Sequence, residues 1–342
     1  MLLTIAIPTY NRNENINFLL SRLLPQINEN VCVQIIDNAS DVPVQDSIID
    51  IKNSLVYIHR NTVNIGMAAN ITRCFEFCET EWLWILGDDD NPDEHAITYI
   101  FETIRKYPKA AFYSFSSNCC HQEDIQVEDC VNIGQEGLIE NLKSFSNLML
   151  LSSGVYNCFE IKKNIKTAYY FSNTFAPQTA ILLDYLGDHI NAETVFLSQS
   201  IARWVEPSKE QQWGLDVINK SIFDLLFIVK TETLKKIFFE KISKYHPYYV
   251  LSEGEAVRLM ALNPENKKEI SADFMCGLYF KYWSRGYKES SIFLYSIKVL
   301  FKFVLLKFNF FAQLLLIKAL KENASKRSIF NKFQEFKKDR RL

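Results

Sequence analysis

Three consecutive aspartates, Asp88, Asp89 and Asp90, follow the apolar run 82–86 (WLWIL) and precede an Asn-Pro turn. Adjacent carboxylates repel one another, so either solvent or a cation must relieve the repulsion. Alternate residues of an extended segment point the same way, so Asp88 and Asp90 can share one cation. Mg²⁺ and Mn²⁺ prefer carboxylate oxygens and are often completed by substrate phosphates. The pattern therefore predicts a metal site at Asp88 and Asp90, with a solvated acidic turn as the plain alternative.

Strands and helices alternate along the N-terminal third of the chain. Short apolar runs predict strands, and apolar residues spaced three and four apart predict helices. This alternation predicts an α/β fold with a mostly parallel twisted sheet, flanking helices and right-handed crossovers. Strands are expected at 2–7, 31–36, 55–58, 82–86 and 110–115, and helices at 13–24, 66–78 and 95–107.

Polar residues follow three of these strands at the point where each strand ends. In open α/β sheets, ligands bind beyond the carboxyl ends of the strands. Three strand ends that supply polar groups to one edge indicate a binding site more strongly than any one of them alone. These residues are Thr9, Asn11 and Arg12 after the first strand, Asp37 and Asn38 after the second, and Asp88 to Asp90 after the fourth.

Four motifs resemble the family 2 glycosyltransferases of the GT-A fold, the fold of nucleotide-diphospho-sugar transferases. They are PTYNR at 8–12, IIDNASD at 35–41, NIGMAAN at 64–70 and WLWILGDDD at 82–90, and the likeness covers about residues 1–120. The ending LGDDD is most similar to abequosyltransferase-like enzymes of bacterial O-antigen and capsule synthesis. The resemblance implies a GT-A domain at 1–215, with a nucleotide-binding half (1–120) and an acceptor half (120–215).

The resemblance also implies roles for individual residues. It places a nucleotide-sugar donor against Pro8, Thr9, Tyr10, Arg12, Asp37, Asn38, Asn64, Gly66, Asn70, Asp88 and Asp89, with Mn²⁺ or Mg²⁺ on Asp88 and Asp90. The metal would stabilise the charge on the leaving nucleoside diphosphate. Pro8 and Gly66 have the alternative of setting backbone shape only, and Asn64 and Asn70 that of turn and cap residues.

The general base is the point at which the sequence departs from the family. The family commonly takes the acceptor's proton with a Glu-Asp pair that opens a helix in the second half of the domain, and inverting members use a carboxylate there. In this chain FAPQT at 175–179 occupies the equivalent helix start, with Gln178 where an acid or a histidine is expected. Glutamine cannot act as a base, so Asp184 is the candidate catalytic residue, with a structural role as the alternative.

The C-terminal region is expected to be helical over 216–342, with helices at 216–239 and 253–262. The net charge of −2 hides an asymmetry, because 298–342 holds twelve Lys/Arg and three Asp/Glu, which leaves −11 for the rest. Residues 292–320 are apolar and aromatic with interspersed lysines, which favours an amphipathic helix on a membrane surface over a core-packed helix. Nucleic acid is not expected as a partner, because the aromatic-rich segment before the basic tail suits lipid better.

The sequence favours a glycosyltransferase over two competing interpretations. The leading hypothesis is a metal-dependent, inverting glycosyltransferase that acts on a lipid-linked oligosaccharide, as a cytoplasmic protein held peripherally at the inner face of the bacterial cytoplasmic membrane. A non-catalytic sugar-nucleotide-binding or scaffold protein is the alternative, and a nucleotidyltransferase is disfavoured because PTYNRNEN lacks glycine. The N-terminus lacks the basic region of a signal peptide, and eight cysteines without paired CxxC spacing indicate free thiols in a reducing compartment.

Overall fold

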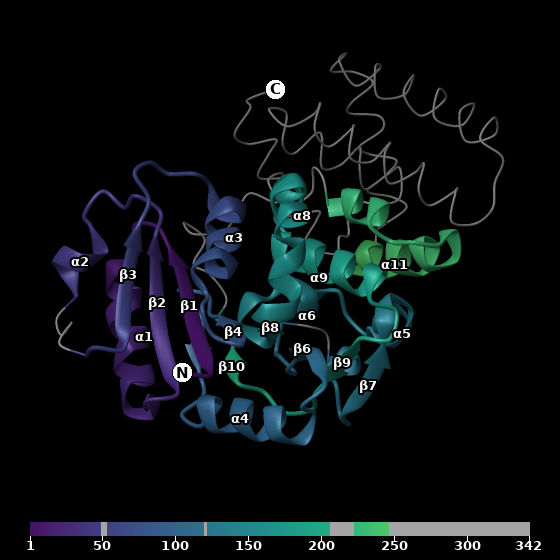
Figure 1. The fold of residues 1–342 in the computed structure, drawn as a ribbon, viewed down its shortest axis with the longest axis horizontal. Helices are drawn as coiled ribbons and strands as arrows, with labels where there is room; N and C mark the ends of the chain where they lie inside the picture. Colours follow the sequence, from purple (N-terminus) through teal and green to yellow (C-terminus); the bar gives the residue numbers. More distant parts are fainter. Residues whose placement is uncertain (49–52, 120–121, 206–221, 246–342) are drawn as a thin grey trace, which may run out of the picture. The chain divides into compact units, whose positions relative to one another are not determined.

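A computed structural model describes residues 1–48, 53–119, 122–205 and 222–245 (Figure 1). Its central feature is an eight-stranded sheet with the order β3-β2-β1-β4-β8-β6-β9-β7. The four strands at one side are parallel. They are β3 (Val56–Arg60), β2 (Val31–Asp37), β1 (Leu3–Thr9) and β4 (Trp82–Ile85). The predicted α/β fold with a mostly parallel sheet is confirmed, and each of these strands lies within two residues of its predicted start.

The other half of the sheet mixes directions. β8 (Gly154–Asn157) lies between β4 and β6 (Ala110–Ser114) and is antiparallel to both. β9 (Glu193–Phe196) is parallel to β6, and β7 (Cys130–Ile133) is antiparallel to β9. A separate two-stranded ribbon pairs β5 (Asn91–Pro92) with β10 (Ala202–Arg203). The irregular pattern of the sequence after residue 140 did not indicate β8, because a strand of four residues offers too little alternation to recognise.

The predicted helices of the N-terminal half are present as α1 (Asn13–Leu23), α3 (Met67–Phe77) and α4 (Ala96–Lys106). The buried face of α1 consists of Ile16, Leu19, Leu20 and Leu23, which is the spacing that predicted this helix. The remaining α-helices are α2 (Val44–Ser47), α5 (Gly134–Asn141), α6 (Ser146–Met149), α7 (Cys158–Ile161), α8 (Ile165–Tyr170), α9 (Pro177–Asp188) and α11 (Glu232–Tyr245). Short 3-10 helices are η1 (Leu24–Gln26), η2 (Gln122–Asp124), η3 (Leu151–Ser153), η4 (Lys162–Asn164), η5 (Ser172–Thr174) and η6 (Ile222–Phe227).

Buried aromatic side chains hold β4 in the centre of the sheet. Trp82 and Trp84 are almost completely buried, and the Trp82 ring stacks on Tyr113 of β6 with ring centroids 4.7 Å apart. The indole Nε1 of Trp84 donates a hydrogen bond of 2.9 Å to the carbonyl of Ser152. Buried rings of this size contribute strongly to core stability. The strand that leads into the three aspartates is therefore firmly anchored.

The predicted helix at 216–239 is not continuous in its described part. Residues 222–227 form η6, and α11 begins only at Glu232. The hydroxyl of Thr231 accepts a hydrogen bond of 3.3 Å from the Leu234 backbone N–H, so Thr231 caps a new helix start. The predicted helix at 253–262 and the basic segment 292–342 lie outside the described residues. No helix of the described part combines the length and apolar character that a bilayer span requires.

Candidate active site

The carboxyl ends of β1, β2 and β4 bring the predicted polar residues together. Thr9 at the end of β1 is opposite Asp37 at the end of β2, and the Asn38 backbone N–H donates a hydrogen bond of 2.9 Å to the Thr9 carbonyl. The Thr9 hydroxyl donates a hydrogen bond of 2.8 Å to Oδ2 of Asp88, just beyond β4. Three strand ends therefore contribute to one edge of the sheet, as predicted.

Arg12 supplies a positive charge to two of the three aspartates. Its Nη1 lies 2.6 Å from Oδ1 of Asp88 and 2.8 Å from Oδ2 of Asp89. Burial raises the pKa of Asp88 above its ordinary value, while Arg12 and Thr9 favour its charged form. Burial also acts to lower the pKa of Arg12, but the two carboxylates outweigh it and the net pKa is raised. The repulsion within the cluster is thus relieved in part by a protein side chain.

Asp90 has different partners from Asp88 and Asp89. The carboxylate is 4% exposed, and its Oδ2 accepts a hydrogen bond of 2.5 Å from the hydroxyl of Ser152. Its Oδ1 is buried and accepts no hydrogen bond within the described residues. Burial raises the pKa of Asp90 to about 6; the hydrogen bond from Ser152 and the nearby Val205 backbone amide oppose this shift, whereas the charge of Asp89 adds to it. Asp90 is therefore the member of the cluster with a buried oxygen that accepts no hydrogen bond from the described residues.

The residues of this site suit a divalent cation that is held by a carboxylate together with substrate phosphates. No group of three His, Cys, Asp or Glu side chains in the described part of the chain is arranged to hold a metal by itself. Cations of the Mg²⁺ type are nevertheless commonly held by one or two carboxylates together with substrate phosphates. The unpaired Oδ1 of Asp90 suits such a site, whereas both oxygens of Asp88 already accept hydrogen bonds from Thr9 and Arg12.

Asp37 is completely buried, and both of its carboxylate oxygens accept hydrogen bonds from nearby residues. Its Oδ1 accepts a hydrogen bond of 2.8 Å from the Ser40 backbone N–H, and its Oδ2 accepts from the Val44 N–H and from Nη1 of Arg60. Burial acts to raise the pKa of Asp37, but the hydrogen bonds from Ser40, Arg60 and Val44 outweigh it, so the net pKa lies below the ordinary value. Asp37 therefore fixes the loop after β2, and Arg60 is a partner that the sequence analysis did not single out.

Replacing Asp37 by asparagine is expected to lower the free energy of unfolding by about 2 kcal/mol at neutral pH, because hydrogen bonds to a buried charge are lost. The folded-state pKa is depressed, so this contribution is present above the ordinary value of 3.8 and is lost as the pH falls through the folded-state pKa. Urea unfolding between neutral pH and about pH 3 measures the difference. Asp41→Asn, an exposed carboxylate of the same loop, is the control; a difference that does not narrow in acid would contradict this account.

A network of asparagine side chains connects the loops after β2 and β3. Asn61 donates hydrogen bonds of 3.0 Å to Asn38 and 2.8 Å to Asn70, and Asn38 donates one of 2.8 Å to Asn64. Asn70 closes the network with a hydrogen bond of 2.9 Å to the Ile36 carbonyl. The predicted donor-site residues Asn38, Asn64 and Asn70 are therefore brought together, and Asn61 joins them although the sequence analysis missed it.

Gly66, Pro8 and Tyr10 are the remaining residues that were predicted to bind the nucleotide-sugar donor. Gly66 has φ of +84° immediately before α3, a conformation that favours glycine. Pro8 lies in β1 opposite Ile36, and Tyr10 is 42% exposed. Tyr10 is thus the predicted donor-site residue whose ring is most open to a ligand.

Gln178 and Asp184 lie on different sides of α9. Gln178 is 1% exposed; its Nε2 donates to the carbonyls of Leu148 and Met149, and its Oε1 accepts no hydrogen bond within the described residues. Asp184 accepts hydrogen bonds of 2.9 Å from Asn164 and 2.5 Å from Thr167. Among the described residues, Asp184 forms no hydrogen bond or ion pair with the aspartate cluster. Gln178 instead donates to the carbonyls of Leu148 and Met149, and this segment continues to Ser152, whose hydroxyl donates to Asp90.

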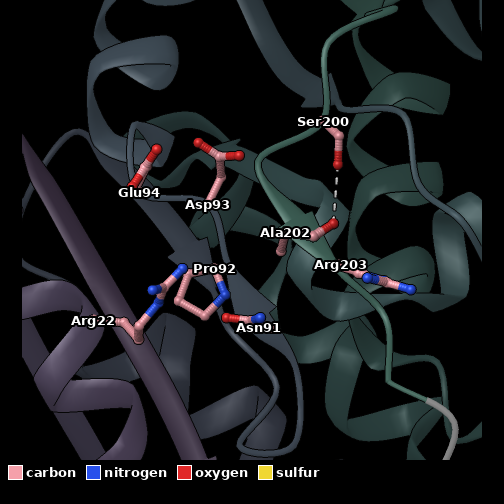
Figure 2. Close-up of a pocket in the computed structure, with 8 residues that line it drawn as sticks. All are labelled: Arg22, Asn91, Pro92, Asp93, Glu94, Ser200, Ala202 and Arg203. Carbon is pink, nitrogen blue, oxygen red and sulfur yellow. Dashed lines mark hydrogen bonds between the residues drawn. The ribbon is translucent and has the colours of Figure 1, made fainter.

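A cavity of about 340 Å³ lies at a different place (Figure 2). It is lined by Arg22, Asn91, Pro92, Asp93, Glu94, Ser200, Ala202 and Arg203. Gln26, just after α1, binds the Asp93 carbonyl with its Nε2, so the cavity lies by the end of α1 that is remote from Arg12. The charges of its two arginines, Arg22 and Arg203, are balanced by those of Asp93 and Glu94, so the cavity has no net charge that would select a ligand.

Comparison with known proteins gives a match over the N-terminal region. Residues 4–130 match the model of the family described as glycosyl transferase family 2. Abequosyltransferase RfbV of Salmonella typhimurium is 33% identical over 95 residues, which are 26% of this chain and 28% of that protein. The match thus spans just over a quarter of the curated relative. The matched region of the family model contains the aspartate cluster, but neither Ser152 nor α9.

Solved structures match over a greater length. The crystal structure of S. aureus TarS 1-349 in complex with UDP-GlcNAc has a TM-score of 0.60 and 13% identity, and the likeness covers 82% of this chain and 81% of TarS 1-349. A longer S. aureus TarS structure has a TM-score of 0.57 and 14% identity, with 81% of this chain and 49% of that chain covered. At these identities the likeness concerns the fold, and it confirms the predicted GT-A fold.

Proposed function

We propose that the protein is a family 2 glycosyltransferase, because residues 4–130 match the model of that family, and that it transfers a sugar from a nucleotide-diphosphate sugar to a hydroxyl acceptor. The observation that carries the proposal is the edge formed by β1, β2 and β4, where Thr9 and Arg12 bind Asp88 and Asp90 has a buried oxygen without a hydrogen bond from the described residues. TarS was crystallised with UDP-GlcNAc, which supports a nucleotide sugar as the donor class.

The donor is proposed to lie across this edge of the sheet. The loop from Pro8 to Arg12, the asparagine network and Gly66 would surround the nucleotide, and Asp37 would hold the loop beside it. Mn²⁺ or Mg²⁺ would be held by Asp90, with Asp88 as the second candidate ligand, and would stabilise the negative charge of the leaving diphosphate. Asp184 remains the proposed carboxylate that takes the acceptor's proton in an inverting reaction.

The acceptor is proposed to be a growing, lipid-linked cell-surface oligosaccharide of the O-antigen or capsule type. The similarity to abequosyltransferase RfbV supports this class. The proposal can be tested by incubating the purified protein with a panel of nucleotide sugars and Mn²⁺, and by following nucleoside diphosphate release with and without candidate acceptors. Binding of a nucleotide sugar without turnover would instead favour the alternative, a non-catalytic sugar-nucleotide-binding or scaffold protein.

The segment 292–342 is proposed to hold the protein at the inner face of the cytoplasmic membrane. Its apolar and aromatic residues, followed by a basic stretch, suit an anionic lipid surface, where each nearby Lys or Arg contributes about 1 kcal/mol. Removing 292–342 is therefore expected to shift most of the protein from the membrane fraction to the soluble fraction. Fractionation followed by immunoblotting measures this, with full-length Asp90→Asn as a control that should stay at the membrane. An unchanged distribution would contradict the proposal.

A further inference from the structure

Ser152 of η3 contacts the strand and turn that carry the aspartates at three points. Its hydroxyl donates to Oδ2 of Asp90 over 2.5 Å and accepts a hydrogen bond of 2.9 Å from the Gly87 backbone N–H. Its carbonyl accepts the hydrogen bond of 2.9 Å from the Trp84 indole. The side chain is 0% exposed. One residue, more than 60 positions away in sequence, is thus attached to the end of β4, to the following turn and to the last aspartate.

The hydroxyl of Ser152 has little freedom in this arrangement. A serine hydroxyl has one proton to donate, and here the proton is directed to Asp90 while the Gly87 N–H occupies an acceptor position. Oδ2 of Asp90 is therefore taken, and Oδ1 is the oxygen left without a hydrogen bond within the described residues. Ser152 consequently decides which oxygen of Asp90 is available.

The backbone of the turn at Gly87 approaches this contact closely. A Cβ added at Gly87 would lie 2.8 Å from Oδ2 of Asp90 and 3.4 Å from Oγ of Ser152. The next residue, Ser153, fixes the same segment from the other side, because its carbonyl accepts a hydrogen bond of 2.8 Å from the Phe115 N–H at the end of β6. The segment that carries Ser152 is thus held by the sheet itself.

We propose that Ser152 is a positioning residue that holds Asp90 so that its Oδ1 faces the divalent cation of the donor complex. The inference rests on the proposed function and adds a residue outside the region that matches the family model. Hydrogen-bond partners of metal ligands orient those ligands, and their loss typically weakens metal binding by about 10-fold to 100-fold.

The test measures direct binding of Mn²⁺ in the presence of UDP. Binding is monitored by electron paramagnetic resonance as the loss of the signal of free Mn²⁺. Ser152→Ala is expected to weaken Mn²⁺ binding about 10-fold or more. Ser153→Ala is the matched control, since the Ser153 hydroxyl donates only to the carbonyls of Asn147 and Leu150 and its loss should leave binding unchanged. The double variant Ser152→Ala/Asp90→Asn should bind no more weakly than Asp90→Asn alone, because Ser152 acts through Asp90.

The outcomes separate this inference from the proposed function. Wild-type affinity in a folded Ser152→Ala variant, or an equal loss in Ser153→Ala, overturns the role of Ser152 and leaves the proposed function standing. Absence of Mn²⁺ binding by the wild-type protein with any nucleoside diphosphate overturns both. If Ser152→Ala lacks a cooperative melting transition, Ser152→Cys provides a similar side chain with a weaker donor, and wild-type affinity in that variant would equally overturn the proposal.

Discussion

Replacing Asp90 by asparagine is expected to lower kcat/KM for sugar transfer by about 10³-fold, the order of loss seen when a group that stabilises transition-state charge is removed. Asparagine keeps the shape of the side chain and can still accept the hydrogen bond from Ser152, so the change is mainly the loss of one negative charge. The measurement is the initial rate of nucleoside diphosphate release over a range of Mn²⁺ concentrations. Added Mn²⁺ should not restore the rate.

The control for this experiment is Glu94→Gln, which removes an exposed carboxylate four residues downstream. It should leave kcat/KM within about 2-fold of the wild-type value, as is usual for a surface substitution away from special features. Turnover that survives in Asp90→Asn would contradict the assignment of Asp90 as the metal ligand. Equal losses in both variants would indicate a general dependence on negative charge.

The same substitution should make the fold more stable, which distinguishes lost chemistry from misfolding. Burial raises the pKa of Asp90 to about 6, so its charged form is disfavoured in the folded protein without metal at neutral pH. Asp90→Asn should therefore raise the free energy of unfolding by about 2 kcal/mol, since one pKa unit corresponds to about 1.4 kcal/mol. The folded-state pKa is the higher one, so the gain is present above about pH 6 and declines as the pH falls towards the ordinary value of 3.8.

The parts of this site that the sequence predicted share one property. Thr9, Asp37 and Asp88 each follow a buried apolar strand, so the strand pattern places them at the carboxyl edge before any contact is known. Parallel pairing then brings them together, because β1 lies between β2 and β4. The position of a residue relative to a strand end was therefore enough to predict that these side chains lie at one edge of the sheet.

The parts that the sequence did not predict depend on contacts between distant segments. Ser152 reaches Asp90 across 62 positions, and nothing in the short segment around it distinguishes Ser152 from Ser153. Arg60 forms its hydrogen bond with Asp37 because the register of β3 against β2 places the two residues opposite each other. Strand register depends on the packing of both faces of the sheet, so a local pattern of residue types cannot supply it.

The aspartate cluster itself shows how the structure changed an expectation. From sequence, a bound cation was the natural means of relieving the repulsion among three carboxylates. In the structure Arg12 already pairs with Asp88 and Asp89, whereas Asp90 accepts a hydrogen bond from Ser152. The cluster thus consists of Arg12 paired with Asp88 and Asp89, and of Asp90, which has one buried oxygen without a hydrogen bond from the described residues.

Replacing Arg12 by alanine is expected to lower the free energy of unfolding by about 3 kcal/mol at neutral pH, because removing one partner of a buried ion pair leaves an uncompensated charge. The side chain of Asp88 is 9% exposed, so water cannot replace the guanidinium fully. Arg12→Lys should be intermediate, since an ammonium group does not reproduce the planar set of donors. Urea unfolding measures the three proteins, and Arg22→Ala, an exposed arginine in the last turn of α1, is the control.

The pH dependence of this loss identifies Asp88 as its cause. Burial already raises the pKa of Asp88, and the loss of Arg12 removes the main opposing interaction, so the pKa should rise further in the variant. A neutral Asp88 needs no counter-charge. The difference between the variant and the wild-type protein should therefore shrink as the pH falls and Asp88 takes up a proton. A difference that stays constant with pH would mean that Arg12 stabilises the loop through packing of its aliphatic stem, and the charge of Asp88 would then have to be satisfied by another group.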